Sequence, residues 1–251
     1  MKHATLVVLR TVLRTASYSA KLAESIAVRS TQFGGVEHYG HKGDDGMQFD
    51  PQLVERQSIY KLLIGCVVPR PIAWVSSISA DAIANVAPFS FFMAVCNDPP
   101  TLAFSSGRRA GGTKDTVQNI EYTQDFVVNI VDDALAEQMN LTSGEYPPDV
   151  DEFALTGLTA APGVRVQAPR VAEAPISMEC RVVQILPVGH GPHSLVLGEI
   201  VYFHIRDDLY NLDTGRIDMH QLHPVGRLAG NLYAHVHDIF EMKRPVENYA
   251  G

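Results

Sequence analysis

The feature that most constrains the fold is a series of short apolar segments that do not alternate regularly with helices. They are rich in Val, Ile, Phe and Ser and are separated by Pro and Gly, as strands and turns are. The predicted strands are 71–79, 86–95, 101–106, 126–131, 176–188, 193–206 and 216–219. No Gly-x-Gly-x-x-Gly motif follows a strand. Both observations disfavour a doubly wound parallel sheet and favour an antiparallel barrel.

A few helices accompany these strands. Apolar residues at helical spacing predict a helix within 50–63, and two more are predicted at 114–123 and 134–142. A turn at 189–192 pairs the two longest strands as a hairpin. The predicted fold class is therefore mainly β with a few helices.

Composition and charge disfavour two classes of function, nucleic-acid binding and membrane association. The formal net charge of −8 disfavours a nucleic-acid surface, which needs clustered Lys and Arg. No apolar run reaches the roughly 18–20 residues that span a bilayer, so no membrane association is expected. The three cysteines are far apart, lie in apolar contexts and form no Cys-x-x-Cys pair. Buried thiols in a reducing compartment fit this pattern, and we expect a cytoplasmic protein.

The first residues differ from the rest in composition. Residues 1–32 contain five basic residues and one acid, with many Ser, Thr and Ala, which resembles a mitochondrial transit peptide. Met47 offers an alternative start after a Gly-containing linker. We predict an N-terminal extension at 1–46, one domain at 47–240 and a tail at 241–251. A dispensable extension is favoured, and a mitochondrial address is the alternative.

A Gly-rich stretch at 107–114 comes close to a phosphate-binding loop. Its Lys114 lies one position late, and Asp115 would repel a triphosphate, so a nucleoside triphosphatase is disfavoured. Lys114 and Thr116 at a helix start can still offer an ammonium, a hydroxyl and backbone N–H groups to a single phosphate. The alternative is that these residues only cap the helix.

Two neighbouring segments, 74–77 and 85–90, combine small hydroxyl residues with Asn85 and the pair Ala87-Pro88. A flavin needs an apolar wall for its ring, amide or backbone partners for its edge, and hydroxyl or cationic partners for its phosphate. Pro88 also suggests an edge or irregular strand position. Each segment alone is better explained as ordinary core strand, but together they make a flavin mononucleotide (FMN) protein the leading hypothesis.

At this point the sequence resembles the flavin reductase-like, FMN-binding split-barrel family, over roughly residues 47–237. That family includes reductase components of two-component flavin monooxygenases and flavoredoxin-type proteins. The resemblance is carried by Val68-Pro-Arg-Pro-Ile-Ala-Trp-Val-Ser76, Asn85-Val-Ala-Pro-Phe-Ser-Phe-Phe92, Asp98-Pro-Pro100, Lys114-Asp-Thr116 with Asn119-Ile120, Phe126-Val-Val-Asn-Ile130 and Arg227-Leu-Ala-Gly-Asn-Leu-Tyr-Ala234. Two departures stand out: Ala229 replaces a glycine of the closing motif, and residues 81–84 lack the glycine usual in that hairpin.

The resemblance implies a split β-barrel, Greek-key-like and antiparallel, that works as a homodimer with FMN close to the subunit interface. Carried over by position, one group of residues would lie against the flavin ring and ribityl chain and another would bind the phosphate. The first group is Trp74, Val75, Ser76, Asn85, Ala87 and Ser90, and the second is Ser105, Lys114 and Thr116.

The resemblance implies an oxidoreductase with NADH or NADPH as co-substrate. Because hydride transfer is the cofactor's chemistry, we predict no catalytic acid or base. The leading hypothesis is an NAD(P)H-dependent flavin reductase that feeds a partner monooxygenase. The alternatives are an FMN-bound electron carrier or oxygenase that does not use NAD(P)H directly, and a non-enzymatic flavin-binding module.

Histidines crowd the C-terminal region, including His220-x-x-His223 and His235-x-His237. Such pairs could be metal ligands. No helix motif with an acid accompanies them, and Pro224 interrupts the local helix. We therefore expect surface or interface histidines and no metal site.

Overall fold

The computed structural model describes residues 41–43, 46–107, 112–190 and 193–243. The transit-like segment 1–32, most of the predicted extension and most of the predicted tail lie outside these residues. The chain divides into two units, Met1–Cys66 and Val67–Gly251. This division falls later than the domain boundary at 46/47 that the sequence suggested, and that boundary stays a prediction.

Within the first unit, a short hairpin precedes a helix. Strands β1 (His41–Gly43) and β2 (Gly46–Gln48) pair antiparallel. Helix α2 spans Arg56–Cys66 and so begins later than the predicted helix at 50–63. The Asp50 carboxylate accepts the Gln52 N–H at 2.9 Å, and Leu53 N–H bonds to the Asp50 carbonyl, which makes a turn in place of the expected first helical turn.

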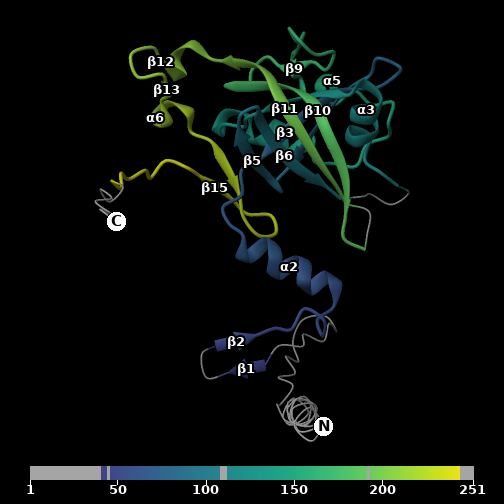
Figure 1. Cartoon of the computed structure of the whole chain (residues 1–251), viewed down its shortest axis with the longest axis vertical. Coiled ribbons are helices and arrows are strands. Elements are labelled where there is room, and N and C mark those ends of the chain that lie inside the picture. Colours follow the sequence, from purple (N-terminus) through teal and green to yellow (C-terminus); the bar gives the residue numbers. More distant parts are fainter. Residues whose placement is uncertain (1–40, 44–45, 108–111, 191–192, 244–251) are drawn as a thin grey trace, which may run out of the picture. The chain divides into compact units, whose positions relative to one another are not determined.

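The second unit contains one seven-stranded sheet in which every neighbouring pair is antiparallel. Its spatial order is β4-β3-β7-β10-β11-β6-β5. The strands are β3 (Ala73–Ile78), β4 (Ala84–Phe89), β5 (Phe92–Asn97), β6 (Pro100–Ser106), β7 (Asp125–Asn129), β10 (Ile176–Val188) and β11 (His193–Ile205). Strands β10 and β11 form the long green hairpin in Figure 1. The mainly β, antiparallel fold predicted from the sequence is confirmed.

The order of strands explains how the sheet curls. β4 and β5 lie at opposite ends of the order, yet only Ser90 and Phe91 connect them. Two residues cannot span a flat sheet of seven strands, since strands lie about 4.8 Å apart. The sheet therefore closes on itself, with a split between β4 and β5 in place of a ladder. The predicted single strand at 86–95 is wrong, because the chain passes from one edge of the sheet to the other at residues 90–91.

Two hydrophobic cores lie on opposite faces of this sheet. Successive residues of β3 point to opposite faces, as the period of a strand requires. Ala73 and Val75 join the core inside the curled sheet with Phe104 and Phe126, whereas Trp74 joins the outer core. Gly198 on β11 permits the inner packing, because a Cβ there would lie 2.4 Å from Cζ of Phe126.

Short helices and small sheets surround the main sheet. They are α3 (Asp115–Thr123), the 3-10 turn η1 (Asp133–Leu135), α4 (Ala136–Leu141), α5 (Glu152–Thr156), the 3-10 turn η2 (Asp207–Leu209) and α6 (Met219–Leu222). The small sheets pair β8 (Ala160–Ala161) with β9 (Arg170–Val171), β12 (Tyr210–Asn211) with β13 (Arg216–Ile217), and β14 (Val225–Arg227) with β15 (Tyr233–His235). Leu135, Met139 and Phe153 from the helical segments cover the outer core around Trp74. The predicted strand at 216–219 is only two residues long, and α6 follows it.

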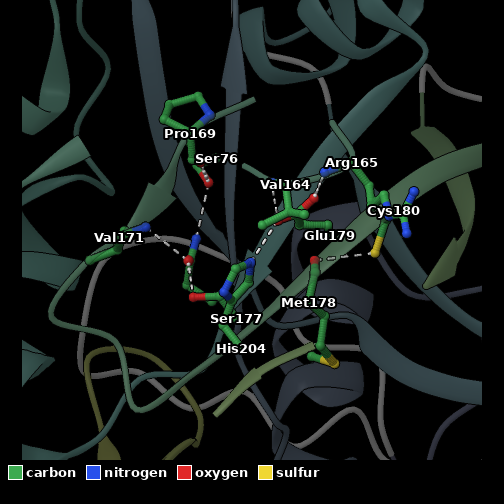
Figure 2. A network of polar contacts seen from close by, with 11 residues as sticks. Ser76, Val164, Arg165, Pro169, Val171, Ser177, Met178, Glu179, Cys180 and His204 are labelled. Atoms are coloured by element: carbon green, nitrogen blue, oxygen red, sulfur yellow. Dashed lines mark hydrogen bonds and ion pairs between the residues drawn. The ribbon is translucent and has the colours of Figure 1, made fainter. Parts of the chain in front are cut away.

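Buried polar side chains hold the loop before β9 against the sheet. Glu179 of β10 is fully buried and accepts the backbone N–H groups of Val164 at 2.7 Å and Arg165 at 2.6 Å. His204 of β11 lies 2.6 Å from the same carboxylate through its Nε2. Figure 2 shows Glu179 between His204 and the loop. Loop N–H groups that have no strand partner are thereby satisfied, as buried backbone requires.

Among the described residues, no helix is both long and apolar enough to cross a membrane.

Candidate functional site

The split between β4 and β5 brings together polar groups from three elements. The backbone N–H of Ser105, on β6, donates to the carbonyl of Phe91 at 2.8 Å. The Lys114 ammonium, at the start of α3, lies 5.3 Å from the centroid of the Phe89 ring. Ser90 lies between those two aromatic residues in the sequence. Ser105 and Lys114, two residues predicted from the sequence as cofactor contacts, thus touch the residues on either side of a third, Ser90.

Arg70 connects this junction to two other segments of the chain. It is 5% exposed, and its guanidinium donates to the carbonyls of Val67 at 2.7 Å and Leu228 at 2.8 Å and to the Ser90 hydroxyl at 3.4 Å. Its backbone also pairs with that of Arg227, in the closing motif. Arg70 therefore links the segment before β3, the split and the closing motif, and it fixes Ser90 in position.

Ala87 and Pro88 are half-buried residues of β4, which ends at Phe89 beside the same junction. Their partners across the sheet are Val75 and Trp74 of β3. Proline has no N–H for a ladder, and β4 is an edge strand, so Pro88 occupies the kind of position that the sequence suggested. The small Ala87 side chain packs against the inner core.

Three other predicted flavin contacts have side chains directed into the protein. Trp74, Val75 and Ser76 are each fully buried. The Trp74 indole donates to the Thr142 hydroxyl at 2.9 Å, and Val75 packs in the inner core. The Ser76 hydroxyl donates to the Pro169 carbonyl, as Figure 2 shows. Their contact with a flavin stays a prediction, and in this chain their side chains support the sheet beneath it.

Asn85 and Thr116 belong to a buried hydrogen-bonded cluster. Thr116 donates to Oδ1 of Asn85 at 2.8 Å, and the Asn85 amide donates to Glu152 at 2.8 Å. Ser77 donates to the same Oδ1 at 3.3 Å and accepts from Asn119 at 3.1 Å. The cluster joins α3 and α5 to β3 and β4. Both predicted site residues are therefore engaged with neighbouring side chains, and their contact with a cofactor also stays a prediction.

Glu152 is the member of this cluster that the sequence did not single out. Burial raises its pKa to about 7, because a charged carboxylate loses hydration there. Within the described part of the chain its Oε2 has no hydrogen-bond partner. Together with Asn85 and Asp115 it lines a pocket of about 280 Å³. Its sequence position gives no sign of this role, because an acid in the first turn of a helix is common. The contact with Asn85 in the folded chain is what reveals it.

The nine predicted site residues therefore fall into two groups. Four are half-buried beside the split or at the start of α3: Ala87, Ser90, Ser105 and Lys114. Five are buried with engaged or packed side chains: Trp74, Val75, Ser76, Asn85 and Thr116. A negatively charged phosphate suits the first group, because an ammonium and two hydroxyls can all donate to its oxygens.

Comparison with known proteins identifies the family. The sequence model of the flavin reductase like domain matches residues 64–219. A protein of Halalkalibacterium halodurans is 38% identical over 204 residues, covering 79% of this chain and 97% of its own length. YwrF of Bacillus subtilis is 36% identical over 201 residues, covering 78% of this chain and 98% of its own.

Solved structures agree. Nitrilotriacetate monooxygenase component B from Bacillus cereus has a TM-score of 0.75 at 36% identity, covering 78% of this chain and 98% of its own. The 2-nitrobenzoate 2-nitroreductase NbaA of Pseudomonas fluorescens scores 0.74 at 31%, covering 81% and 100%. A Shewanella frigidimarina protein with a split barrel domain scores 0.70 at 22%, covering 79% and 100%, and supports the fold alone. The chain therefore folds as a split barrel and belongs to the flavin reductase-like family.

Proposed function

We propose that the chain is an NAD(P)H-dependent flavin reductase that binds FMN and supplies reduced flavin to a partner monooxygenase. The observation that carries this proposal is that the Ser105 backbone and the Lys114 ammonium contact Phe91 and Phe89, the residues on either side of Ser90 at the split of the barrel. Similarity to a protein named as a monooxygenase component, at 36% identity, supports the partner class.

The phosphate of FMN would be bound by Lys114, Ser105 and Ser90. This proposal moves Ser90 from the ribityl chain to the phosphate, in place of Thr116, whose hydroxyl donates to Asn85. The ammonium supplies charge, and the hydroxyls supply directed donors. Because Arg70 holds the Ser90 hydroxyl at 3.4 Å and the Phe91 carbonyl holds the Ser105 backbone, these groups are positioned before any ligand arrives. Such preorganisation lowers the entropic cost of binding.

The flavin ring would lie along the edge of β4 at Ala87 and Pro88, which are both half-buried. Bound flavin supplies the redox chemistry, so this chain needs no acid or base of its own to move a hydride. Its residues position the ring and limit access of water. Trp74 and Val75 would act from beneath by keeping β3 rigid, because both are fully buried.

Strand β5 supports the proposal of a homodimer. It is an edge strand whose residues Met93 to Asn97 are all exposed in the single chain, including Met93 at 59% and Val95 at 42%. A long apolar edge is normally covered. We propose that a second copy covers it, and that the flavin site beside the split lies close to this interface.

Flavin titration tests the site. The purified protein should quench FMN fluorescence more strongly than that of riboflavin, which lacks the phosphate. Lys114→Gln should weaken FMN binding about tenfold or more, the effect of losing one charge-assisted contact, and leave riboflavin binding unchanged. Lys61→Gln, an exposed lysine on α2, is the matched control. Equal losses for both ligands would contradict a phosphate role for Lys114.

Anaerobic reduction tests the reaction. Adding NADH or NADPH to the FMN-loaded protein should bleach the yellow absorbance within seconds. A protein that binds FMN but is bleached only by an added reductase would be an electron carrier or an oxygenase. A protein whose flavin resists both treatments would be a binding module.

A second candidate reaction is reduction of a nitroaromatic acid. It is favoured by the similarity to NbaA, which is named as a 2-nitrobenzoate 2-nitroreductase and is covered along its whole length. Steady-state oxidation of NAD(P)H with FMN present, with and without 2-nitrobenzoate, separates the two. Consumption of the nitro compound in proportion to the NAD(P)H oxidised would favour the nitroreductase.

A further inference from the structure

Three segments that are distant in sequence lie side by side near the C-terminal end of the described chain. Asp133 N–H donates to the carbonyl of His223 at 3.2 Å. The residue preceding Asp133 forms a β-bridge with Pro224. In the β14–β15 pair, Val225 lies opposite His235. The backbone therefore holds the start of η1, the end of α6 and the end of β15 in one small sheet-like arrangement.

This arrangement directs two imidazoles at one carboxylate. Nδ1 of His235 lies 2.7 Å from Oδ1 of Asp133, and Nε2 of His237 contacts Oδ2 of the same group. The candidate ligand atoms of the three residues all lie within 4.8 Å of one another. His235 and His237 are two apart on an extended segment, so their side chains share a face.

The cluster is open to solvent on one side. His235 and His237 have side-chain exposures of 71% and 52%, while Asp133 is partly covered at 29%. The ring of His223 packs edge-on against His237, with centroids 4.8 Å apart, and restricts that imidazole. The geometry thus combines restrained ligands with an entry path for a hydrated ion.

We propose that Asp133, His235 and His237 bind a divalent transition-metal ion, with Zn²⁺ the best match and water in the remaining position. Two imidazole nitrogens and one carboxylate oxygen are a donor set typical of Zn²⁺ with three protein ligands. Mg²⁺ and Ca²⁺ prefer oxygen ligands and fit less well. This differs from the absence of a metal site that the sequence suggested, because Asp133 is 102 residues away from His235.

The position of the site indicates its effect. His235 ends β15, whose pairing with β14 is only three residues long. An ion held between this strand and Asp133 would fasten the chain after the closing motif to the body of the barrel. Because such an ion binds the folded state, it would raise the melting temperature, and above the Kd this increase would follow the logarithm of the ion concentration.

Zn²⁺ itself is the probe. Full-length protein without a histidine tag is freed of metal with a chelator, exchanged into non-chelating buffer and titrated calorimetrically. The wild type should bind one Zn²⁺ per chain. Asp133→Asn, His235→Gln and His237→Gln should each weaken binding by at least about tenfold, since even indirect partners of metal ligands matter at that level. His190→Gln, an exposed histidine in the β10–β11 turn, is the matched control.

Thermal unfolding provides a second measurement that does not depend on calorimetry. In chelator, circular dichroism should show that the variants remain folded. Added Zn²⁺ should raise the melting temperature of the wild type and of His190→Gln but not that of His237→Gln. The proposal is overturned if the wild type binds no Zn²⁺, which would make the cluster a hydrogen-bonded triad only. Equal binding by wild type, His235→Gln and His237→Gln would also overturn it.

Discussion

At the scale of single residues, Ala82 has a backbone conformation that L-amino acids rarely adopt. Its φ is 60°, in the turn between β3 and β4. Ser79 maintains this turn, since its carbonyl accepts the Ala82 N–H at 3.0 Å and its hydroxyl accepts the Ile83 N–H at 3.1 Å. Residues 81–84 lack the glycine that is usual in this hairpin of the family. Ala82 is the residue among them with a positive φ, which glycine adopts without strain.

Ala82→Gly should therefore stabilise the protein. Left-handed backbone costs an alanine roughly 1–2 kcal/mol, partly offset by the greater freedom of glycine in the unfolded chain. We expect the free energy of unfolding in urea to rise by about 0.5–1 kcal/mol. Ala80→Gly, in the same turn but without a positive φ, should give no gain. A loss of stability in Ala82→Gly would mean that the turn is not strained.

Residue identity suggested nine candidate site residues, but it does not show which of their side chains are available to a ligand. Motifs selected Ser90, Ser105 and Lys114. Ser105 and Lys114 contact the residues on either side of Ser90, and the binding of a cofactor by these three residues stays a prediction. The same motifs selected Asn85, but its amide bonds Glu152, 67 residues away. Whether a polar side chain faces a ligand or a buried partner depends on tertiary contacts, and a single sequence does not encode those as a local pattern.

At the scale of elements, strands were predicted well where they are long and regular. β10 spans Ile176–Val188, the predicted range, and β11 agrees to within one residue. The failure at 86–95 has a clear cause: apart from Ser90 the stretch is apolar, and composition alone cannot show that its two halves pair with different strands. β4 pairs with β3, and β5 pairs with β6.

The contact of α5 with β4 makes a prediction about pH. Glu152, in the first turn of α5, bonds Asn85 of β4, and burial raises its pKa from 4.5 to about 7. The folded state therefore keeps a proton that the unfolded state has lost between these values. Stability should fall as pH rises from about 4.5 to about 7. The full shift would correspond to about 3 kcal/mol, and partial screening by solvent reduces the expected loss to on the order of 2 kcal/mol.

Glu152→Gln tests this linkage. The neutral amide can still accept from Asn85, so the contact between α5 and β4 is retained while the titration is removed. Urea unfolding from pH 5 to pH 8 should show a smaller decline in the variant, which should be the more stable protein at pH 8. Glu137→Gln, an exposed acid on α4, is the control. Parallel profiles for wild type and Glu152→Gln would contradict the assignment.

At the scale of the whole molecule, the barrel follows from strand order more than from any motif. Because β4 and β5 are sheet edges joined by two residues, the sheet must curl, and the split must lie where they meet. The sequence implied this architecture only through family resemblance. Closure of the sheet could not be predicted from the residues themselves, because pairing between strands as distant as β3 and β7 leaves no local pattern in the sequence.

The split also leaves β5 as an edge that a single chain does not cover. A charged residue at its exposed apolar positions would lose hydration in a dimer but not in a monomer. Light scattering of the wild type should therefore give twice the chain mass of 27.5 kDa, and Val95→Lys should give the monomer mass. Because the flavin site is proposed to lie close to the interface, FMN affinity should fall in the same variant.

The control is Leu212→Lys, at a residue that is 88% exposed beside the short β12 strand. This substitution should change neither the mass nor the FMN affinity. A wild-type monomer would rule out the dimer, and a Val95→Lys dimer would move its interface away from β5.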